Sequence, residues 1–437
     1  MSRKLITRIG AVLLWIAVWQ LLAMFVNNDI LLVTPIKAIK ALALECCKAS
    51  FWQTVSLSFL RILMGFTAGF VIAVFFAVLS FRFSFVETVL APVMTLLKAI
   101  PVVSFVVLLL IWWGASFLSV AICFLVVLPN LYVNTLAGLK NTPVSLLEMA
   151  KVFRLPFWNC FYYIYRPALK PFLLSGLSIS LGMCWKSGVA AEVIGTPAFS
   201  IGERLYMSKI YLDTAGVFAW TAVTILLSWM FEKGCMFLMN KWFSFEPRVK
   251  APEDKNGLTD RGSEKGFIRM SHVNKCYGDK KVLTDFSAEY APGEIHYLTW
   301  PSGAGKTTLF RLLCGLEEAD SGEVSNMGAA SVMFQENRLC EDYSAVRNVE
   351  MVLGNACHAR EALINLLEAE DIEKTCSQLS GGMKRRVALV RAMEAKSDYL
   401  LLDEPFTGMD EKTRERAREY IAANTKGRTV IIATHTF

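Results

Sequence analysis

The chain divides into two parts by the spacing of its apolar residues. Up to about residue 245 it consists of long apolar runs separated by short polar segments, and beyond that point apolar residues come in short groups. A membrane-spanning helix needs about 20 predominantly apolar residues, whereas short strands alternating with helices are typical of α/β domains. The pattern therefore predicts an all-α transmembrane domain followed by an α/β domain.

Six spanning helices are predicted in the first part. Residues 99–139 contain no charged residue and are about twice as long as one span requires, so we expect two helices joined by a turn at Trp113-Gly114-Ala115-Ser116. The other four spans are predicted at residues 9–26, 62–81, 172–190 and 214–231.

The basic residues predict the orientation of these spans. Arg3, Lys4 and Arg8 precede the first span, which places the N-terminus in the cytoplasm by the positive-inside rule. With six spans, the segment between the fourth and fifth is also cytoplasmic, and it too is rich in lysine and arginine. The first apolar run has no small-residue cleavage site, so we expect it to remain as an anchor rather than be removed as a signal peptide. The chain is therefore predicted to be a multi-pass protein of the cell membrane (plasma or inner membrane).

Composition excludes several other classes of protein. The chain is 54% hydrophobic and 19% charged, which averages a membrane part with a soluble part. Its net charge of +7 would suit nucleic-acid binding, but much of the excess basic charge flanks apolar spans, so we expect a membrane and no nucleic acid as its partner. The 11 cysteines show no C-x-x-C spacing, which argues against a disulfide framework.

A polar segment separates the two parts. It is rich in Pro, Lys, Asp and Gly, which is typical of a linker. We therefore expect a transmembrane domain at residues 1–245, a linker at 246–265 and a nucleotide-binding domain at 266–437.

A candidate phosphate loop lies in the second part. The run Pro301-Ser302-Gly303-Ala304-Gly305-Lys306-Thr307-Thr308 follows an apolar segment and precedes a helical one. Backbone amides at a helix N-terminus can cradle the phosphates of ATP, Lys306 can reach the β and γ oxygens, and the Thr307 hydroxyl can hold Mg²⁺. One position departs from the pattern, because Trp300 stands where the motif has its first glycine.

Two further motifs accompany the candidate phosphate loop in the second part of the chain. Leu379-Ser380-Gly381-Gly382-Met383 opens a helix, continues with Lys384-Arg385-Arg386, and offers the Ser380 hydroxyl and the amides of Gly381 and Gly382 as a second anion site. The apolar strand at residues 400–402 ends in Asp403 and Glu404. In this order the motifs resemble those of ABC ATPases. The resemblance implies that Asp403 holds Mg²⁺ and that Glu404 polarises the attacking water.

The resemblance extends to more positions of the α/β part. Gln335 is similar to the residue that senses Mg²⁺ and contacts the permease, His435 to the switch histidine, and Tyr277 to the aromatic that stacks on adenine; Gly408-Met409-Asp410 resembles the dimer-contacting loop. Structural alternatives stay open: Tyr277 as a core aromatic, His435 as a strand-end histidine, and Asp403-Glu404 as a helix cap. Only two residues follow His435, so we expect this domain to be short at its C-terminal end.

The cytoplasmic loop between the fourth and fifth spans carries a third pattern. Glu148-Met149-Ala150, Arg154 and Ile164-Tyr165-Arg166-Pro167 follow the spacing E-A-A-x-x-x-G-x9-I-x-L-P, with departures at Met149, Arg154 and Arg166. It resembles the loop of binding-protein-dependent importer permeases, whose short helix docks on the ATPase. The resemblance implies a coupling role for Glu148, Ala150 and Pro167. An ordinary amphipathic loop helix is the alternative.

Short motifs along the transmembrane part are similar, in their order, to those of the nitrate, sulfonate and taurine class of ABC importers. They are Thr34-Pro35, Ser58-Phe59-Leu60-Arg61 with Gly65, Ala99-Ile100-Pro101, Trp112-Trp113-Gly114, Pro129-Asn130 with Asn134-Thr135, and Ala190-Ala191-Glu192.

Together the resemblances imply a half-transporter in which a type I importer permease and an ATPase are fused. ATP and Mg²⁺ are the implied cofactors. A second copy of the chain, or a related half-transporter, and an extracytoplasmic substrate-binding protein are the implied partners. The alternative is a non-hydrolysing ATP-binding or regulatory membrane subunit, for which Trp300 would be a symptom of decay. An exporter fits less well, because the importer-type loop is present and long intracellular helical extensions are not.

Lys186 is the one hint about the solute. It lies within the fifth predicted span, where a buried lysine is costly and is often functional. A position on the translocation path would favour an anionic solute. A lysine that snorkels to the interface or pairs with another helix is the alternative.

Overall fold

A computed structural model describes residues 3–245, 249, 267–301, 303–326 and 328–434 of the chain. The chain forms two compact units, one made of Met1–Asn141 with Leu169–Phe245 and the other of Thr142–Ala168 with Glu246–Phe437. Of the predicted linker at 246–265, all but Val249 lies outside the described residues.

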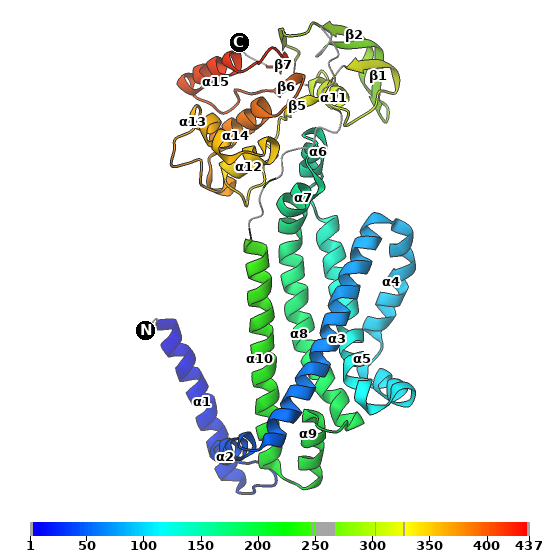
Figure 1. The fold of residues 1–437 in the computed structure, drawn as a ribbon, viewed down its shortest axis with the longest axis vertical. Coiled ribbons are helices and arrows are strands. Elements are labelled where there is room, and N and C mark those ends of the chain that lie inside the picture. Colours follow the sequence, from blue (N-terminus) through cyan, green and yellow to red (C-terminus); the bar gives the residue numbers. More distant parts are fainter. Residues whose placement is uncertain (1–2, 246–248, 250–266, 302, 327, 435–437) are drawn as a thin grey trace. The chain divides into compact units, whose positions relative to one another are not determined.

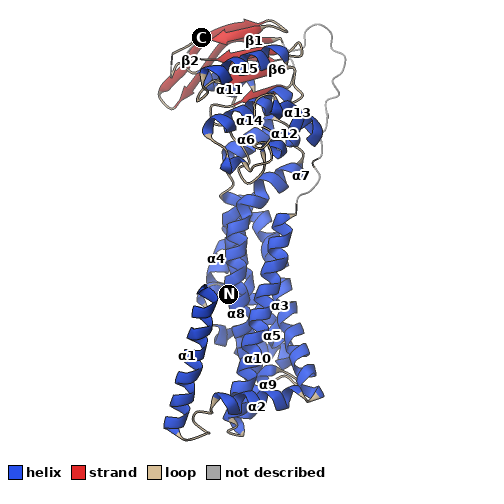
Figure 2. Cartoon of the chain, turned by 90° about the vertical axis from the view of Figure 1, so that its left-hand side faces the viewer, coloured by secondary structure: helices blue, strands red, loops and turns tan. Residues whose placement is uncertain are grey.

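The first unit is helical (Figures 1 and 2). Its longest helices are α3, α5, α8 and α10, and α3 packs along α5 while α10 contacts α2 and α9. The helices are α1 (Arg3–Val26), α2 (Pro35–Cys46), α3 (Ala49–Arg82), α4 (Ser84–Ala99), α5 (Val102–Lys140), α8 (Arg166–Gly195), α9 (Ile201–Ile210) and α10 (Thr214–Ser244).

Four stretches of helix in the described part of the chain are long and apolar enough to cross a membrane: Ala49–Arg82, Val102–Lys140, Phe157–Gly195 and Thr214–Ser244. A shorter apolar helix covers Leu13–Val26. Four apolar helices make this a multi-pass membrane domain, whereas the predicted count of six is not established by this criterion.

The difference from the predicted count arises at two places. The first predicted span, residues 9–26, is a shorter apolar helix by this criterion, and the two spans predicted within residues 99–139 lie in one long helix, α5. The predicted turn at residues 113–116 is a break within α5, where Gly114 adopts φ 71° and ψ −179°, and helix resumes on both sides. Glycine tolerates this conformation because it has no Cβ. Helix α4, whose 16 residues include Glu87 and Lys98, was not predicted from the apolar pattern.

The second unit contains two sheets, coloured red in Figure 2. An antiparallel sheet has the order β2-β1-β4 and a parallel sheet the order β3-β7-β6-β5. Strands β6 and β7 are buried along their whole length, as expected for central strands of a parallel sheet covered on both faces. The strands are β1 (Ile268–Tyr277), β2 (Lys280–Tyr290), β3 (Ile295–Leu298), β4 (Ser321–Asn326), β5 (Ala330–Met333), β6 (Tyr399–Asp403) and β7 (Thr429–Ala433).

The helices of this unit follow the strands in sequence. They are α11 (Lys306–Leu313), α12 (Ala345–Leu353), α13 (Ala356–Ile364), α14 (Gly381–Glu394) and α15 (Glu411–Ala423), with a 3₁₀ turn at Cys376–Gln378. The candidate phosphate loop follows β3, Gln335 follows β5, and Asp403 ends β6. Because carboxyl ends of parallel strands share one edge of a sheet, the topology gathers these motifs where α/β sheets bind ligands.

The loop at residues 142–168, here called the coupling loop, belongs to the second unit. It contains α6 (Val144–Val152), α7 (Phe157–Cys160), a π-helical turn η1 (Phe161–Tyr165) and the start of α8. Met149, Ala150, Val152, Tyr163 and Ile164 join the same apolar core as β1, β3 and α11. The coupling loop is therefore packed as part of the α/β unit.

Candidate functional site

The phosphate loop has the backbone conformation that its glycines permit. Gly303 and Gly305 have φ of 80° and 94°, and Gly305 directly precedes α11. A Cβ at Gly305 would lie 3.0 Å from a side-chain carbon of Val282, so both the φ and the space favour glycine there. The loop thus ends at the N-terminus of an eight-residue helix, where backbone amides can face phosphate.

Trp300 is accommodated next to this loop. Its ring packs edge-on against Phe286 of β2, with centroids 5.2 Å apart, and it contacts the core of the unit. Trp300 is not among the described residues with positive φ. Its backbone carbonyl accepts a hydrogen bond of 2.8 Å from Nζ of Lys306. The Lys306 side chain is thereby held at the edge of the loop.

Thr307 and Asp403 come together as expected for a Mg²⁺ site. The Thr307 hydroxyl donates to Oδ2 of Asp403 at 3.3 Å, although the residues are 96 positions apart. Burial raises the pKa of Asp403, and the Thr307 hydroxyl and the cations of Arg385 and Lys306 oppose that rise. A hydroxyl beside a carboxylate is the hard-oxygen donor set that Mg²⁺ prefers, so these two residues fit the ion. Gln335 lies two residues after β5 and is exposed.

Glu404 follows Asp403 in a strained backbone conformation. It has φ 50°, while its amide donates to the Ala433 carbonyl at 2.9 Å. Its carboxylate accepts a hydrogen bond of 3.3 Å from the Thr407 hydroxyl. Residues in such conformations persist where neighbouring strands fix them, and they cluster at functional sites.

Arg385 of α14 joins the loops that follow β5 and β6. Its guanidinium donates to the carbonyls of Phe334 (2.8 Å), Gln335 (2.7 Å) and Glu404 (2.8 Å), and to that of Asp403. Burial lowers its pKa, and the nearby carboxylates of Asp403 and Glu404 oppose this. Helix α14 begins with Ser380-Gly381-Gly382, which resembles the signature motif of ABC ATPases, and it is therefore fixed to the strand end that carries the two carboxylates.

The signature motif forms the N-terminus of α14. The Ser380 side chain caps the helix by accepting from the Met383 amide at 3.3 Å, and Ser380 and Gly381 are exposed. A Cβ at Gly382 would lie 2.8 Å from the Gly408 carbonyl, so these two motifs are in close contact. The open end of α14 can face an anion outside this chain.

Tyr277 ends β1 near the phosphate loop and is 45% exposed. Its hydroxyl donates to Glu317, and Nζ of Lys275 lies 5.7 Å from its ring. Burial and the Glu317 carboxylate raise the pKa of Tyr277, while the Thr308 hydroxyl opposes that rise. An exposed ring beside Thr308 can stack on a base.

Glu148 of the coupling loop forms a charge cluster with two arginines. Arg311 of α11 donates two hydrogen bonds to its carboxylate, at 2.6 and 3.0 Å, and Arg338 lies 2.8 Å away. The bond from Arg311 holds the pKa of Glu148 below its ordinary value. Because Arg311 lies on the phosphate-loop helix and Arg338 follows Gln335, Glu148 contacts both segments adjoining the candidate ATP site.

A second contact of the coupling loop centres on Tyr343. Its hydroxyl donates to the Tyr162 carbonyl at 2.8 Å and accepts from Arg166 at 3.1 Å, while its ring packs on Tyr163. Arg166, where the importer pattern has leucine, is buried with 2% exposure. The departure from the pattern is thus matched by a polar partner in the α/β domain.

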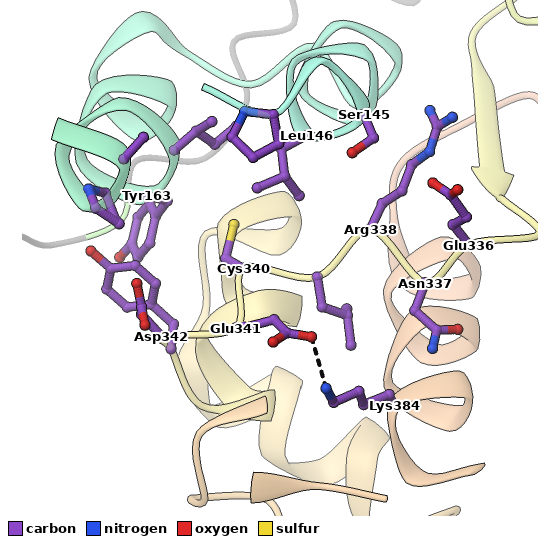
Figure 3. Close-up of a pocket in the computed structure, with 16 residues that line it drawn as sticks. Ser145, Leu146, Tyr163, Glu336, Asn337, Arg338, Cys340, Glu341, Asp342 and Lys384 are labelled. Atoms are coloured by element: carbon purple, nitrogen blue, oxygen red, sulfur yellow. Dashed lines mark hydrogen bonds and ion pairs between the residues drawn. The ribbon is translucent and has the colours of Figure 1, made fainter. Parts of the chain in front are cut away.

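A cavity of about 620 Å³ separates part of the coupling loop from the α/β domain (Figure 3). Pro143, Ser145 and Pro167 line it from the loop, and Glu336, Arg338 and Cys340 from the other side. The dashed line in Figure 3 marks the ion pair between Lys384 and Glu341, which measures 2.7 Å. Pro167 therefore borders the cavity, whereas Ala150 is buried in the core.

Lys186 lies on an exposed face of α8 that is otherwise apolar. Ile179, Met183 and Ile194, at helical spacing from it, are 52%, 43% and 44% exposed. Glu192 is fully buried on the same helix, where it accepts from the Ser58 hydroxyl at 2.8 Å and lies 3.9 Å from Arg61. Lys186 and Glu192 thus have separate surroundings on this helix.

Two predicted site residues, Ser302 and His435, lie outside the described residues. The structure also places at the site five residues to which no role was assigned from the sequence: Arg311, Glu317, Arg338, Tyr343 and Arg385. Only Arg385 adjoins a recognised motif. The others carry no motif signal, and each has a partner far away in the sequence, such as Glu148 for Arg311 and Tyr277 for Glu317.

Comparison with known families agrees with this geometry. Residues 65–232 match the family described as binding-protein-dependent transport system inner membrane component, and residues 283–407 match the family described as ABC transporter. The chain is therefore a permease domain fused to an ABC transporter ATPase domain. It is a multi-pass membrane protein with the ATPase domain as its cytoplasmic part.

Individual relatives match the ATPase domain. The aliphatic sulfonates import ATP-binding protein SsuB 3 of Rhodococcus jostii is 37% identical over 39% of this chain and 66% of its own length. The corresponding SsuB protein of Ralstonia nicotianae is also 37% identical, over 38% of this chain and 63% of its own length. The Nod factor export ATP-binding protein I of Paraburkholderia xenovorans is 35% identical over 38% of this chain and 62% of its own length. The chain thus spans just under two thirds of the length of these relatives.

One similar solved structure is a dimeric ATP-binding cassette in a post-hydrolysis state, bound to ADP and Pi. The match covers 39% of this chain and 88% of that chain. It is 25% identical, with a TM-score of 0.36.

Proposed function

We propose that this protein is a half-transporter that uses ATP hydrolysis to import a small anionic solute. The observation that carries the proposal is the position of Glu148, a permease-loop residue bound to Arg311 of the phosphate-loop helix. This contact gives a physical route by which a change at the nucleotide acts on the permease. A membrane anchor with no transport role would not need it.

In this proposal the chain's own residues bind and orient ATP. Amides from Gly303 to Thr308 face the phosphates, Tyr277 stacks on adenine, and Lys306 exchanges the Trp300 carbonyl for phosphate oxygens. Thr307, Asp403 and Gln335 would hold Mg²⁺, which neutralises phosphate charge when bound. Glu404 accepts the proton of the attacking water, and His435 would act as the switch histidine.

The working unit we propose contains two copies of the chain. The exposed N-terminus of α14, with Ser380 and Gly381, suits the phosphates of an ATP bound to the second copy. Two permease domains then enclose the solute path. A six-crossing topology for each would use α1 and α4 besides the four long apolar stretches.

The exposed face of α8 supports an anionic solute. A lysine facing lipid in mid-span costs about 2.5–3.5 kcal/mol, so such residues usually face a polar cavity or a partner. We propose that Lys186 lines the path between the two copies. The sulfonate-import relatives of the ATPase domain favour an organic sulfonate, delivered by an extracytoplasmic binding protein.

Reconstitution in liposomes tests the proposal. We expect ATP-dependent uptake of an aliphatic sulfonate that requires a cognate binding protein, with phosphate release stimulated by that protein. ATP hydrolysis without uptake of any anion would contradict the transport function.

A non-hydrolysing regulatory subunit is the second candidate. The observation in its favour is Trp300 at the first glycine of the phosphate loop, with Lys306 bound to its carbonyl. The purified chain would then bind ATP weakly or not at all and release no phosphate. Measured phosphate release above that of a Glu404→Gln variant excludes this candidate.

A further inference from the structure

Glu317 lies in the turn between α11 and β4, where it contacts two residues of the site at once. One carboxylate oxygen accepts from the Tyr277 hydroxyl and the other from Nε of Arg311. Its own amide donates to the Arg311 carbonyl at 3.2 Å. The carboxylate is thus fixed between the end of β1 and the phosphate-loop helix.

Arg311 uses its donors in two directions. Its Nε donates a hydrogen bond to Glu317, while its two terminal nitrogens donate to Glu148 of the coupling loop, at 2.6 and 3.0 Å. A planar guanidinium has its donors in a fixed fork, so rotating it for one carboxylate misaligns it for the other. Tyr277, Glu317, Arg311 and Glu148 therefore form one continuous chain of hydrogen bonds.

The carboxylates of Glu317 and Glu148 are ionised at neutral pH. Partial burial opposes ionisation of Glu317, but hydrogen bonds from Tyr277 and Arg311 outweigh it and hold its pKa below the ordinary value. Hydrogen bonds to an ionised group are shorter and stronger than neutral ones. Losing the charge on Glu317 would weaken both of its bonds together.

We infer that Glu317 is a positioning residue that orients Tyr277 for adenine and Arg311 for Glu148, and so links base binding to the coupling loop. The inference rests on the proposed function, in which Tyr277 stacks on the base. A nucleotide that orders Tyr277 thereby orders the coupling loop, and by linkage the docked loop strengthens nucleotide binding to the same extent.

The test compares a ligand that has a base with one that lacks it. Full-length protein in lipid nanodiscs is titrated with MgATP and with magnesium tripolyphosphate. We expect Glu317→Gln to weaken ATP binding by about tenfold and tripolyphosphate binding by less than about twofold. Retained tripolyphosphate binding also shows that the variant has a folded phosphate loop.

Hydrogen–deuterium exchange measures the effect of the nucleotide on the coupling loop. MgATP should slow deuterium uptake in residues 144–152 of the wild type, and this slowing should be absent in Glu317→Gln. Tyr277→Phe should reproduce the loss of ATP affinity. It should leave the ligand-free exchange of this segment unchanged, because the hydrogen bond between Arg311 and Glu317 remains. Glu318→Gln is the matched control, since Glu318 accepts a hydrogen bond from Lys275 through its backbone carbonyl, which the substitution leaves in place. It should match the wild type in every measurement.

Three outcomes overturn the inference. Equal losses for ATP and tripolyphosphate would make Glu317 a general structural residue. Behaviour of Glu317→Gln like that of Glu318→Gln would show that it positions nothing. In both cases the wild type still binds ATP, and the proposed function stands. Absence of ATP binding by the wild type would overturn the proposed function and the inference together.

Discussion

Among single residues, Trp300 shows how a phosphate loop can keep its shape after losing a glycine. The ring packs on Phe286, and the conformations that need glycine are retained by Gly303 and Gly305. The residue before a proline favours extended conformations, which tryptophan adopts without strain. What the substitution removes is the space and conformational freedom that glycine would supply next to the phosphates.

We therefore expect Trp300→Gly to bind ATP more tightly and to be less stable than the wild type. The gain follows from the added room, and the loss of about 1–3 kcal/mol follows from the lost packing on Phe286, which is less than for a fully buried tryptophan. Titration with a fluorescent ATP analogue measures the first effect and thermal unfolding the second. Weaker binding by the glycine variant would show that Trp300 supports the site.

Glu404 is the residue on which hydrolysis depends in the proposed mechanism. Glu404→Gln keeps the shape of the side chain but removes its basicity, so turnover should fall by roughly 10²–10⁴ while ATP affinity stays within about twofold. Phosphate release and equilibrium binding separate these effects. A turnover equal to the wild type would remove Glu404 from the mechanism.

At the level of elements, the coupling loop depends on a charge cluster as well as on apolar packing. Helix α6 contributes Met149 and Ala150 to the core, and Glu148 to the two arginines. The apolar contacts hold the helix at all pH values. The ion pairs hold it only where Glu148 is ionised, so pH can separate the two contributions.

The sign of the pH effect follows from the direction of the pKa shift. Arg311 lowers the pKa of Glu148 from its ordinary 4.5, so the stabilisation is present above that value and is lost as the pH falls through the lower folded value. Glu148→Gln should therefore lower the apparent unfolding temperature at pH 7, and its difference from wild type should shrink below about pH 4.5. Measurements are made on the full chain in detergent.

Glu336→Gln is the control for this prediction, because Glu336 is an exposed carboxylate that lines the neighbouring cavity. It should match the wild type across the same pH range. A difference between Glu148→Gln and wild type that stays constant down to pH 3 would show that packing, and not charge, explains the effect of the substitution.

For the whole molecule, the proposed path between two copies places Lys186 against the solute. Lys186→Met keeps the length of the side chain and removes its charge. We expect uptake of an anionic solute to fall by at least tenfold, with basal ATP hydrolysis unchanged, because the residue is remote in sequence from every ATP-site motif. Lys209→Met is a suitable control on another helix. Normal uptake by Lys186→Met would return this lysine to a snorkelling role.

The sequence by itself determined the features that depend on local pattern. Apolar runs predicted the membrane helices, and glycine positions with a following helix predicted the phosphate loop, because both signals lie within a few turns of chain. The order of motifs also indicated the ATPase through its resemblance to ABC ATPases. The sequence also predicted the break at Gly114, where a non-helical residue separates the two helical parts of α5.

Only the tertiary structure decided which distant side chains meet. Arg311 and Glu148 are 163 positions apart, and Tyr343 and Arg166 are 177 apart, so no periodicity joins them. The pairing of these side chains depends on how whole helices and strands pack together, which a linear pattern does not encode. For the same reason the sequence pointed to Tyr277 and Glu148 separately, and only the fold connected them through Glu317.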